Sequence, residues 1–220
     1  MMLGTEANAP ARKWKSACLL LGGFALCLPM LAQAASCQDI DQRLNALASA
    51  DQQVRQDGEN VERDAGATAA EKAAMRQRWR EVDLQNLKQL KAIIADCGWP
   101  GSKKGSHSAW LLAQHADSDL AFQHLALSLL AASVTRGVAD PKDLAYLADR
   151  IASNEHRPQE YGTQFMQTDR CHLELLPVDK VELVTRRRLA IGLSSLDAYQ
   201  REMRERFVAT DCQAGDPPAR

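Results

Sequence analysis

The sequence predicts a mainly α-helical protein, with a single domain of about six helices. Apolar residues recur at the three- and four-residue spacing of amphipathic helices over most of the chain. Glycine, proline and capping residues stand where these patterns stop. Only residues 155–178 lose the helical period, and their prolines and glycine predict a short hairpin or an extended loop.

The first expected helix covers residues 38–62, where apolar residues alternate with polar ones at helical spacing, and Gly66 ends it. A second, longer helix begins at the capping box formed by Thr68 and Glu71. Its apolar face continues to Gly98, which has the position of a helix C-terminus.

The centre of the chain is expected to form the buried part of the domain. Residues 101–105 predict a short basic loop, and residues 109–113 and 120–134 predict strongly apolar helical segments. Between these segments, residues 117–119 either cap a new helix or kink a continuous one. Gly137 ends the unit.

Two capping aspartates predict the remaining helix starts. Asp140, followed by a first-turn proline, opens a helix that extends to about Ser153. After the irregular segment, Asp179 is expected to cap a helix that extends to Ile191, and a last helix covers residues 196–207.

Residues 1–34 have the pattern of a secretory signal peptide. Basic residues precede an apolar run from Ala17 to about Ala32, and an Ala-x-Ala cleavage signal ends at Ala34. The run is shorter than the roughly 20 residues of a membrane-spanning helix, so a retained anchor is the less favoured alternative. We therefore expect a periplasmic or secreted domain, residues 35–220, without a stable membrane span after cleavage.

Four of the six cysteines, Cys37, Cys97, Cys171 and Cys212, follow the signal segment. Four cysteines in an exported chain favour two disulfides, for which three connectivities are possible. One attractive pairing joins Cys37 to Cys97 and Cys171 to Cys212, because it ties each end of the chain inward.

Composition excludes several functional classes. The formal net charge is −1, so the chain lacks the basic excess typical of nucleic-acid-binding proteins. Cysteine and histidine spacings match no zinc or redox motif, and no phosphate-binding glycine loop or nucleophile elbow is present. We expect no metal and no cofactor. The sequence carries no signature of an oligomeric state.

His115 is the candidate catalytic base. In a continuous helix, Asp119 would lie one turn later and could orient the imidazole, and Asp117 is a second nearby carboxylate. A histidine oriented by a carboxylate can act as a general base, because imidazole titrates close to neutral pH. The alternative is a buried histidine with a purely structural role.

A second group of polar residues predicts a site for a small polar or anionic ligand. Arg150 and either Arg186 or Arg187 could bind an anion in bidentate fashion. Gly162 is expected to form a turn, and the polar residues around it either bind a ligand or fix the loop to the helices. The expected ligand-binding residues are Gln123, Asp149, Arg150, Gln159, Tyr161, Thr163, Gln164, Arg186 and Arg187.

Several motifs occur in a specific order between residues 80 and 200. They are Asp83-x-x-Asn86, Gly98-Trp99-Pro100, Gln114-His115-Ala116-Asp117-x-Asp119-x-x-x-Gln123, Ala145-Tyr146-Leu147-x-Asp149-Arg150, Pro158-Gln159-x-Tyr161-Gly162-Thr163-Gln164 and Arg186-Arg187. This order resembles an uncharacterised bacterial domain-of-unknown-function family. The resemblance implies a site at these positions without a known reaction, and it places the first helix outside the family core.

The sequence therefore predicts an exported enzyme that acts on a small polar or anionic substrate. His115 would be the base, oriented by Asp117 or Asp119. Two alternatives stay open: a non-catalytic periplasmic module for ligand binding or interaction, and a disulfide-stabilised structural scaffold.

Overall fold

The computed structural model of the protein describes residues 37–64, 66–208 and 212. The predicted signal peptide, residues 1–34, lies outside the described residues. Those that are described form a single, mainly helical domain with seven helices and one small sheet, which confirms the predicted fold class.

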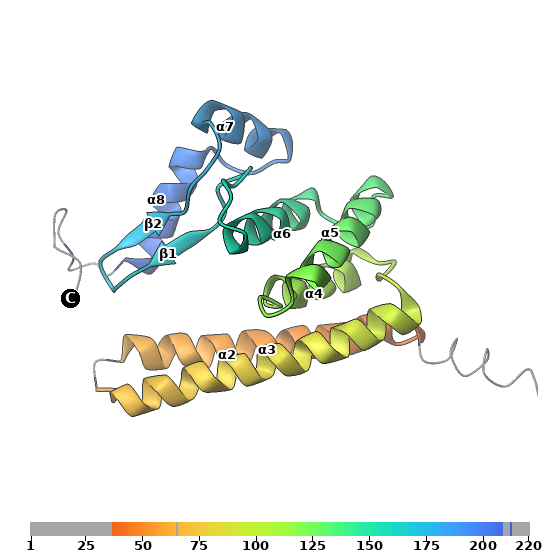
Figure 1. Ribbon diagram of the computed structural model, residues 1–220, viewed down its shortest axis with the longest axis horizontal. Helices are drawn as coiled ribbons and strands as arrows, with labels where there is room; N and C mark the ends of the chain where they lie inside the picture. Colours follow the sequence, from red (N-terminus) through yellow and green to blue (C-terminus); the bar gives the residue numbers. More distant parts are fainter. Residues whose placement is uncertain (1–36, 65, 209–211, 213–220) are drawn as a thin grey trace, which may run out of the picture.

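Helices α2 (Ile40–Arg63) and α3 (Ala69–Cys97) form an antiparallel pair along one side of the molecule (Figure 1). Gly58 permits their close packing, because a Cβ atom there would lie 2.2 Å from Cζ2 of Trp79. The indole Nε1 of Trp79 donates a hydrogen bond to the carbonyl oxygen of Val54 at 2.7 Å. An aromatic side chain of α3 thus lies directly against the backbone of α2.

Both ends of the α2–α3 pair are as predicted. Thr68 and Glu71 form the capping box at the start of α3, where each side chain accepts a hydrogen bond from the backbone amide of the other. At the opposite end, Cys37 and Cys97 form a disulfide with their Cα atoms 5.6 Å apart. The first predicted disulfide pairing is confirmed.

Helix α4 (Lys103–Gln114) begins earlier than predicted, so the expected loop at residues 101–105 is wrong in its second half. Ser102 is the N-cap, and its hydroxyl accepts a hydrogen bond from the amide of Gly105 at 2.9 Å. A Cβ atom at Gly105 would lie 2.0 Å from Oδ1 of Asp41 in α2. The glycine therefore marks close helix packing rather than a loop.

Helix α5 (Leu120–Thr135) is separate from α4, which decides between the two alternatives for residues 117–119. The carboxylate of Asp119 caps α5 by accepting a hydrogen bond from the amide of Phe122 at 2.9 Å. This separation explains why the described residues contain seven helices instead of about six. Apolar residues of α2 to α6 share one core, whose completely buried leucines include Leu44, Leu90 and Leu130.

Helix α6 (Pro141–Asn154) begins at the predicted N-cap, Asp140, whose carboxylate accepts a hydrogen bond from an amide of the first turn. Strands β1 (Phe165–Gln167) and β2 (Leu173–Leu175) then form an antiparallel hairpin. The hairpin alternative for residues 155–178 is confirmed.

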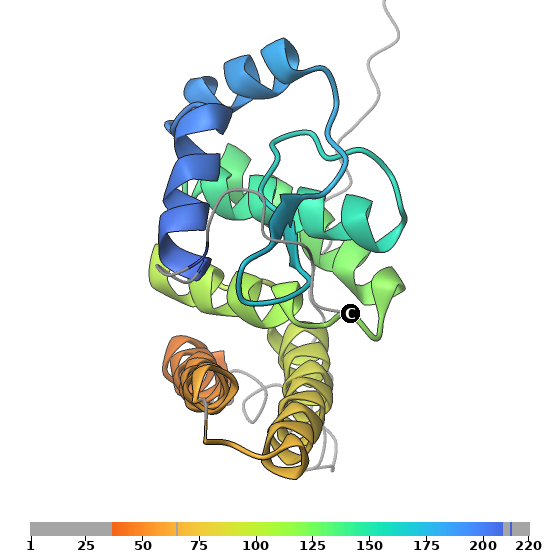
Figure 2. The same cartoon turned by 90° about the vertical axis from the view of Figure 1, so that its left-hand side faces the viewer.

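Helix α8 (Leu196–Phe207) lies beside the hairpin, and α7 (Val181–Ala190) contacts α8; both are away from the α2–α3 pair (Figures 1 and 2). Helix α8 has the predicted bounds. The predicted cap of α7 is wrong, because Lys180 is its N-cap and has no side-chain capping bond. Asp179 instead forms an ion pair with Arg187, whose Nη1 lies 3.0 Å from Oδ2.

The second disulfide joins Cys171, in the hairpin, to Cys212, beyond α8, with Cα atoms 5.4 Å apart. This confirms the second predicted pairing. None of the described helices combines the length and the apolar character needed to cross a membrane.

Candidate functional site

Asp51 is a buried carboxylate in the middle of α2 and the centre of a polar cluster. Its Oδ2 lies 2.9 Å from Nδ1 of His115 and 3.2 Å from Nε of Arg55. Its Oδ1 accepts a hydrogen bond from Nδ2 of Asn86 at 3.3 Å. Burial by itself raises the pKa of Asp51, but the hydrogen bond and charge of His115, with Arg55, outweigh it and leave the pKa lowered. The carboxylate is therefore stabilised in its charged form.

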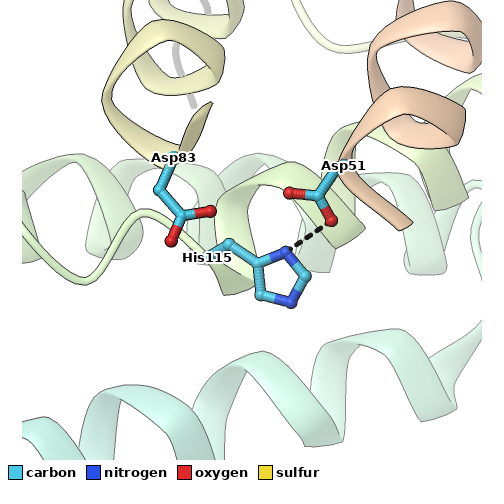
Figure 3. A group of neighbouring side chains, drawn as sticks. All are labelled: Asp51, Asp83 and His115. Atoms are coloured by element: carbon cyan, nitrogen blue, oxygen red, sulfur yellow. Dashed lines mark ion pairs between the residues drawn. The ribbon is translucent and has the colours of Figure 1, made fainter. Parts of the chain in front are cut away.

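His115 immediately follows α4 as its C-cap, and its side chain is 15% exposed. Figure 3 shows one ring nitrogen facing Asp51 and the other directed away from both Asp51 and Asp83. Among the described residues, Nε2 of His115 has no hydrogen-bond partner. A carboxylate that fixes one ring nitrogen and leaves the other available is the arrangement of a catalytic histidine.

Nδ1 of His115 has two competing partners. It can donate a hydrogen bond to Asp51 or accept one from Nε of Arg55 at 3.0 Å, but a single neutral nitrogen cannot do both. In the first arrangement Nε2 has a free lone pair and is a base. In the second arrangement Nε2 carries the proton and is a hydrogen-bond donor.

Asp83 of α3 approaches the cluster from the other side (Figure 3). Its Oδ1 forms an ion pair with Nη2 of Arg55. Burial raises the pKa of Asp83; Arg55 and His115 offset part of this effect, whereas the negative charges of Asp51 and Asp117 add to it. As the pH falls, Asp83 therefore takes up a proton before Asp51.

Asp51, Asp83 and His115 also form a possible set of metal ligands. One ligand atom from each lies within 4.8 Å of the others, and carboxylate and imidazole are common ligands of divalent ions. Arg55, however, contacts all three side chains. A metal ion would compete with its guanidinium for the same atoms. That the protein binds no metal stays a prediction.

A second chain of polar contacts links Asp117 to the loop. Nε of Arg150 lies 3.0 Å from Oδ1 of Asp117 and also donates to the carbonyl oxygen of Gln114 at 3.2 Å. Nη1 of Arg150 donates to Oε1 of Gln164 at 3.2 Å. Arg150 thus contacts residues on both sides of His115 in the sequence, and its Nη2 has no hydrogen-bond partner in the described part of the chain.

Three backbone amides of the 158–164 loop bind the side chain of Asp149 in α6. Asp149 has no exposed surface and accepts hydrogen bonds from the amides of Glu160, Tyr161 and Thr163 at 2.8, 3.0 and 2.9 Å. Burial raises the pKa of Asp149, and these bonds offset only part of the increase. Asp149 therefore fixes the loop, and the prediction of a direct ligand contact gains no support from these bonds.

Gln159 is also completely buried and serves the same loop. Its Oε1 accepts from the amide of Gln164 at 2.7 Å, and its Nε2 donates to the carbonyl oxygens of Gln164 and Leu176 at 3.1 and 3.0 Å. Oγ1 of the buried Thr163 accepts from Nε2 of Gln164 at 2.9 Å. Both amides and the threonine thus use their hydrogen-bonding groups within the fold.

The arginine that turns inward on α7 is Arg188, whereas the sequence analysis named Arg186 or Arg187. Arg186 is exposed. Arg187 binds Asp179 and the carbonyl oxygen of Glu160 at the edge of the loop. The preference for Arg186 or Arg187 was wrong, because only position 188 faces the loop from the buried side of α7.

Two further predicted contacts differ from the structure. Asp119 does not reach His115, because the helix is interrupted between them; its Oδ2 instead forms an ion pair with Lys91 at 2.7 Å. Gln123 is buried, and its Nε2 donates to the carbonyl oxygen of Ala113 at 3.1 Å and to Asp117 at 3.2 Å. The carboxylate that orients His115 is thus Asp51, and Gln123 joins α5 to the end of α4.

A second carboxylate–histidine pair lies at the start of α4. Nδ1 of His107 lies 3.0 Å from Oδ2 of Asp143, and both line a hollow of about 310 Å³ with Lys103 and Asp140. The His107 side chain is 60% exposed and has no arginine or second carboxylate bonded to it. His115 is therefore the better-organised candidate.

The sequence analysis did not assign roles to Asp51 and Arg55. A signal was present: the apolar stripe of the first helix contains Leu44, Leu47 and Val54, and Asp51 occupies the buried position between the last two. A charged residue on a buried helical stripe needs a partner, which Arg55, one turn later, provides. Asp83 belonged to a quoted motif but also received no role.

Fold and site together define a class: a mainly helical, disulfide-bonded domain that encloses an Asp–His–Arg cluster. Comparison with family models identifies the family. Residues 38–209 match the Family of unknown function (DUF6624), and the chain belongs to this family. No curated protein and no solved structure matches the chain.

The matched region begins at residue 38, so the prediction that the first helix lies outside the family core is wrong. Helix α2 is part of the family domain. Asp51 and Arg55 therefore belong to the same family region as His115.

Proposed function

We propose that the protein is an exported enzyme in which His115 acts as a general base on a small polar or anionic substrate. One observation carries the proposal: Nδ1 of His115 faces the buried carboxylate of Asp51, while Nε2 has no partner among the described residues. In the tautomer whose Nδ1 donates to Asp51, Nε2 is unprotonated and can accept a proton. The charge of Asp51 then stabilises the imidazolium that forms.

In this proposal the substrate binds to groups near His115 whose hydrogen-bonding atoms have no partner among the described residues. Nη2 of Arg150 offers a charged donor for an anionic group. Asp117, which is bonded to Arg150, orients the guanidinium. Gln164 supports Arg150 from the loop side. In this proposal the loop positions the arginine, and its buried residues do not themselves contact the substrate.

Export is part of the proposal. The signal-like pattern of residues 1–34 and the two disulfides both fit an oxidising compartment, where such bonds persist. We therefore place the mature domain in the periplasm or outside the cell.

A structural scaffold is the second candidate, and it also has an observation in its favour. Gln123, Asp149 and Gln159 are completely buried and form hydrogen bonds within the fold. If the His115 cluster has the same purpose, its loss costs stability and nothing else.

The test uses the full chain and three proteins: wild type, His115→Gln and His124→Gln. His124 is the matched control, because its Nε2 lies 2.8 Å from Glu155 in an exposed carboxylate–histidine pair away from the cluster. Each protein is incubated with a mixture of small metabolites, and consumption is followed by mass spectrometry. We expect wild type and His124→Gln to consume the same compound, and His115→Gln to consume it about 10²–10⁴-fold more slowly.

Thermal shifts with the same mixture separate the alternatives. Stabilisation by a compound that is not consumed indicates a binding module and contradicts the enzyme. Neither stabilisation nor consumption, with a melting temperature lowered only in His115→Gln, supports the scaffold. Equal consumption by folded His115→Gln and wild type excludes His115 as the base.

A further inference from the structure

Arg188 is a completely buried arginine without a counter-ion. Its Nε donates to the carbonyl oxygen of Ser194 at 2.7 Å, and its Nη1 donates to that of Tyr161 at 2.8 Å. Its Nη2 is buried and has no hydrogen-bond partner, and no carboxylate in the described part of the chain forms an ion pair with it. Buried charges in proteins are normally paired, because desolvation of an isolated ion is costly.

The buried carboxylate of Asp149 does not supply that partner. Its negative charge raises the pKa of Arg188, but burial has the larger effect and leaves that pKa lowered. The oxygens of Asp149 bind amides of the loop, whereas Arg188 binds the carbonyl oxygen of Tyr161 in the same loop. The guanidinium therefore keeps one donor without a partner, and no ion pair compensates its charge among the described residues.

An aromatic cluster lies beside this guanidinium. The guanidinium carbon of Arg188 is 4.4 Å from the centroid of the Tyr199 ring. The Tyr199 ring in turn contacts Phe165, at a centroid distance of 5.7 Å, and Tyr146, at 6.5 Å. Trp110 meets Tyr146 edge-on at 6.2 Å. We call these four rings, which come from α4, α6, β1 and α8, the aromatic cluster.

The other end of the aromatic cluster also has unsatisfied polar atoms. Nε1 of Trp110 and Oε1 of Gln114 are buried without hydrogen-bond partners in the described residues. They lie one helical turn apart, and therefore on the same side of α4. Tyr199 is buried, but Trp110 and Phe165 are partly exposed. Two rings of the cluster are thus partly exposed, and its buried ring, Tyr199, lies against the guanidinium of Arg188.

We propose that Arg188 and the aromatic cluster form a binding site for a small organic carboxylate with a planar apolar body. The carboxylate accepts from Nη2 of Arg188 and supplies the missing negative charge. The planar body packs against the rings of Tyr199, Tyr146 and Phe165. A bound water would satisfy Nη2 but would leave the buried charge without compensation. This site uses none of the residues of the His115 cluster.

Isothermal titration of the full chain with benzoate and benzamide tests the charge requirement. The two probes share the ring, and only benzoate is an anion. We expect saturable binding of benzoate with a Kd below about 1 mM, and at least about tenfold weaker binding of benzamide. Equal binding of both probes, or no saturable binding of benzoate, would overturn the proposal.

Variants locate the binding. Arg188→Lys keeps the positive charge but removes the guanidinium fork, and we expect benzoate to bind about tenfold more weakly. Arg186→Gln, an exposed change on the same helix, is the matched control and leaves the Kd unchanged. Equal loss of affinity in both would indicate non-specific attraction to the basic helix and contradict the site.

Arg188→Lys also risks loss of the fold, so a second variant is needed. Trp110→Leu removes one ring of the aromatic cluster and its unpaired donor, and we expect at least about threefold weaker benzoate binding. The His115→Gln protein should bind benzoate as wild type does. Unchanged binding in folded Trp110→Leu, or lost binding in His115→Gln, would place the anion elsewhere.

Discussion

Asp51 and Asp149 are both aspartates with no exposed surface, but they have opposite surroundings. Asp51 binds side chains from three helical elements, those of Arg55, Asn86 and His115. Asp149 instead accepts hydrogen bonds from three backbone amides of one loop. The pKa of Asp51 is lowered by its positively charged neighbours despite burial, whereas burial raises that of Asp149.

The difference separates two uses of a buried charge. Asp149 determines the path of the loop, and all its visible partners are part of the chain's own architecture. Asp51 orients an imidazole whose second nitrogen stays available. A carboxylate that binds backbone therefore indicates a structural role, and one that binds a titratable side chain indicates a site for chemistry.

The largest expected effect is a loss of stability on removal of Asp149, the carboxylate with the structural role. Asp149→Ala leaves three buried or partly buried amides without an acceptor, and we expect the free energy of unfolding to fall by about 3–5 kcal/mol. Urea denaturation followed by circular dichroism measures it. Asp197→Ala, an exposed change in α8, should cost no more than about 0.5 kcal/mol. A loss below about 1 kcal/mol for Asp149→Ala would show that the loop is fixed by other contacts.

Asp51→Asn should lower the free energy of unfolding less than Asp149→Ala does, but it should strongly slow consumption of the substrate. Its carboxamide keeps one acceptor oxygen, so we expect a loss of about 1–3 kcal/mol in the free energy of unfolding. It can no longer stabilise an imidazolium at His115, and consumption of the substrate should fall about 10²–10⁴-fold. Nitrogen NMR of the imidazole should show an altered tautomer. An unchanged tautomer and rate would remove Asp51 from the proposed mechanism.

Gly162 tests how tightly the loop is packed. It has a φ of 65°, and a Cβ atom there would lie 2.7 Å from Cδ1 of Leu196. Gly162→Ala should therefore cost about 2–3 kcal/mol, from both backbone strain and the contact. Gly137 has a similar φ of 75° but open space around it, so Gly137→Ala should cost only about 1 kcal/mol. Equal losses would mean that the loop can move away from α8.

The smallest expected effect is a contrast in pH dependence. The folded pKa of Asp51 is lowered, so its contribution to stability is complete above 3.8 and is lost as the pH falls through the folded value. The folded pKa of Asp149 is raised, so its contribution is largest below 3.8 and declines as the pH rises through the folded value. Between pH 3 and pH 6, the stability difference between wild type and Asp51→Asn should grow with pH. For Asp149→Asn the stability difference should shrink over the same pH range. Urea denaturation at each pH measures both differences. If both change with pH in the same direction, the predicted contrast between Asp51 and Asp149 is wrong.

Much of the fold was predictable because its signals are local. The capping box of Thr68 and Glu71, the N-cap at Asp140 and the bounds of α8 each depend on residues within a few positions. The errors occurred where a distant contact overrides local preference. Gly105 reads as a loop residue, but it permits the close contact of α4 with Asp41 of α2.

The site was predicted only in part for the same reason. His115 stood out as a histidine among carboxylates, but Asp117 or Asp119, which are close to it in the sequence, was expected to orient it. The break between α4 and α5 directs Asp119 to Lys91, and helix packing brings Asp51 to the imidazole from 64 positions earlier in the chain. No role was predicted for Arg188, because three adjacent arginines give no indication of which one is buried.

The sequence by itself determined the helical class, most of the helix termini, the hairpin segment and the four cysteines that form the two disulfides. It also identified His115, Arg150 and the loop as the polar part of the molecule. Only the tertiary structure decided which charges meet: Asp51 with His115, Asp149 with the loop amides, and Arg188 with the aromatic cluster. The physical reason is the sequence distance over which each interaction acts. Capping and periodicity act over one or two helical turns, whereas desolvation and ion pairing depend on which elements pack together.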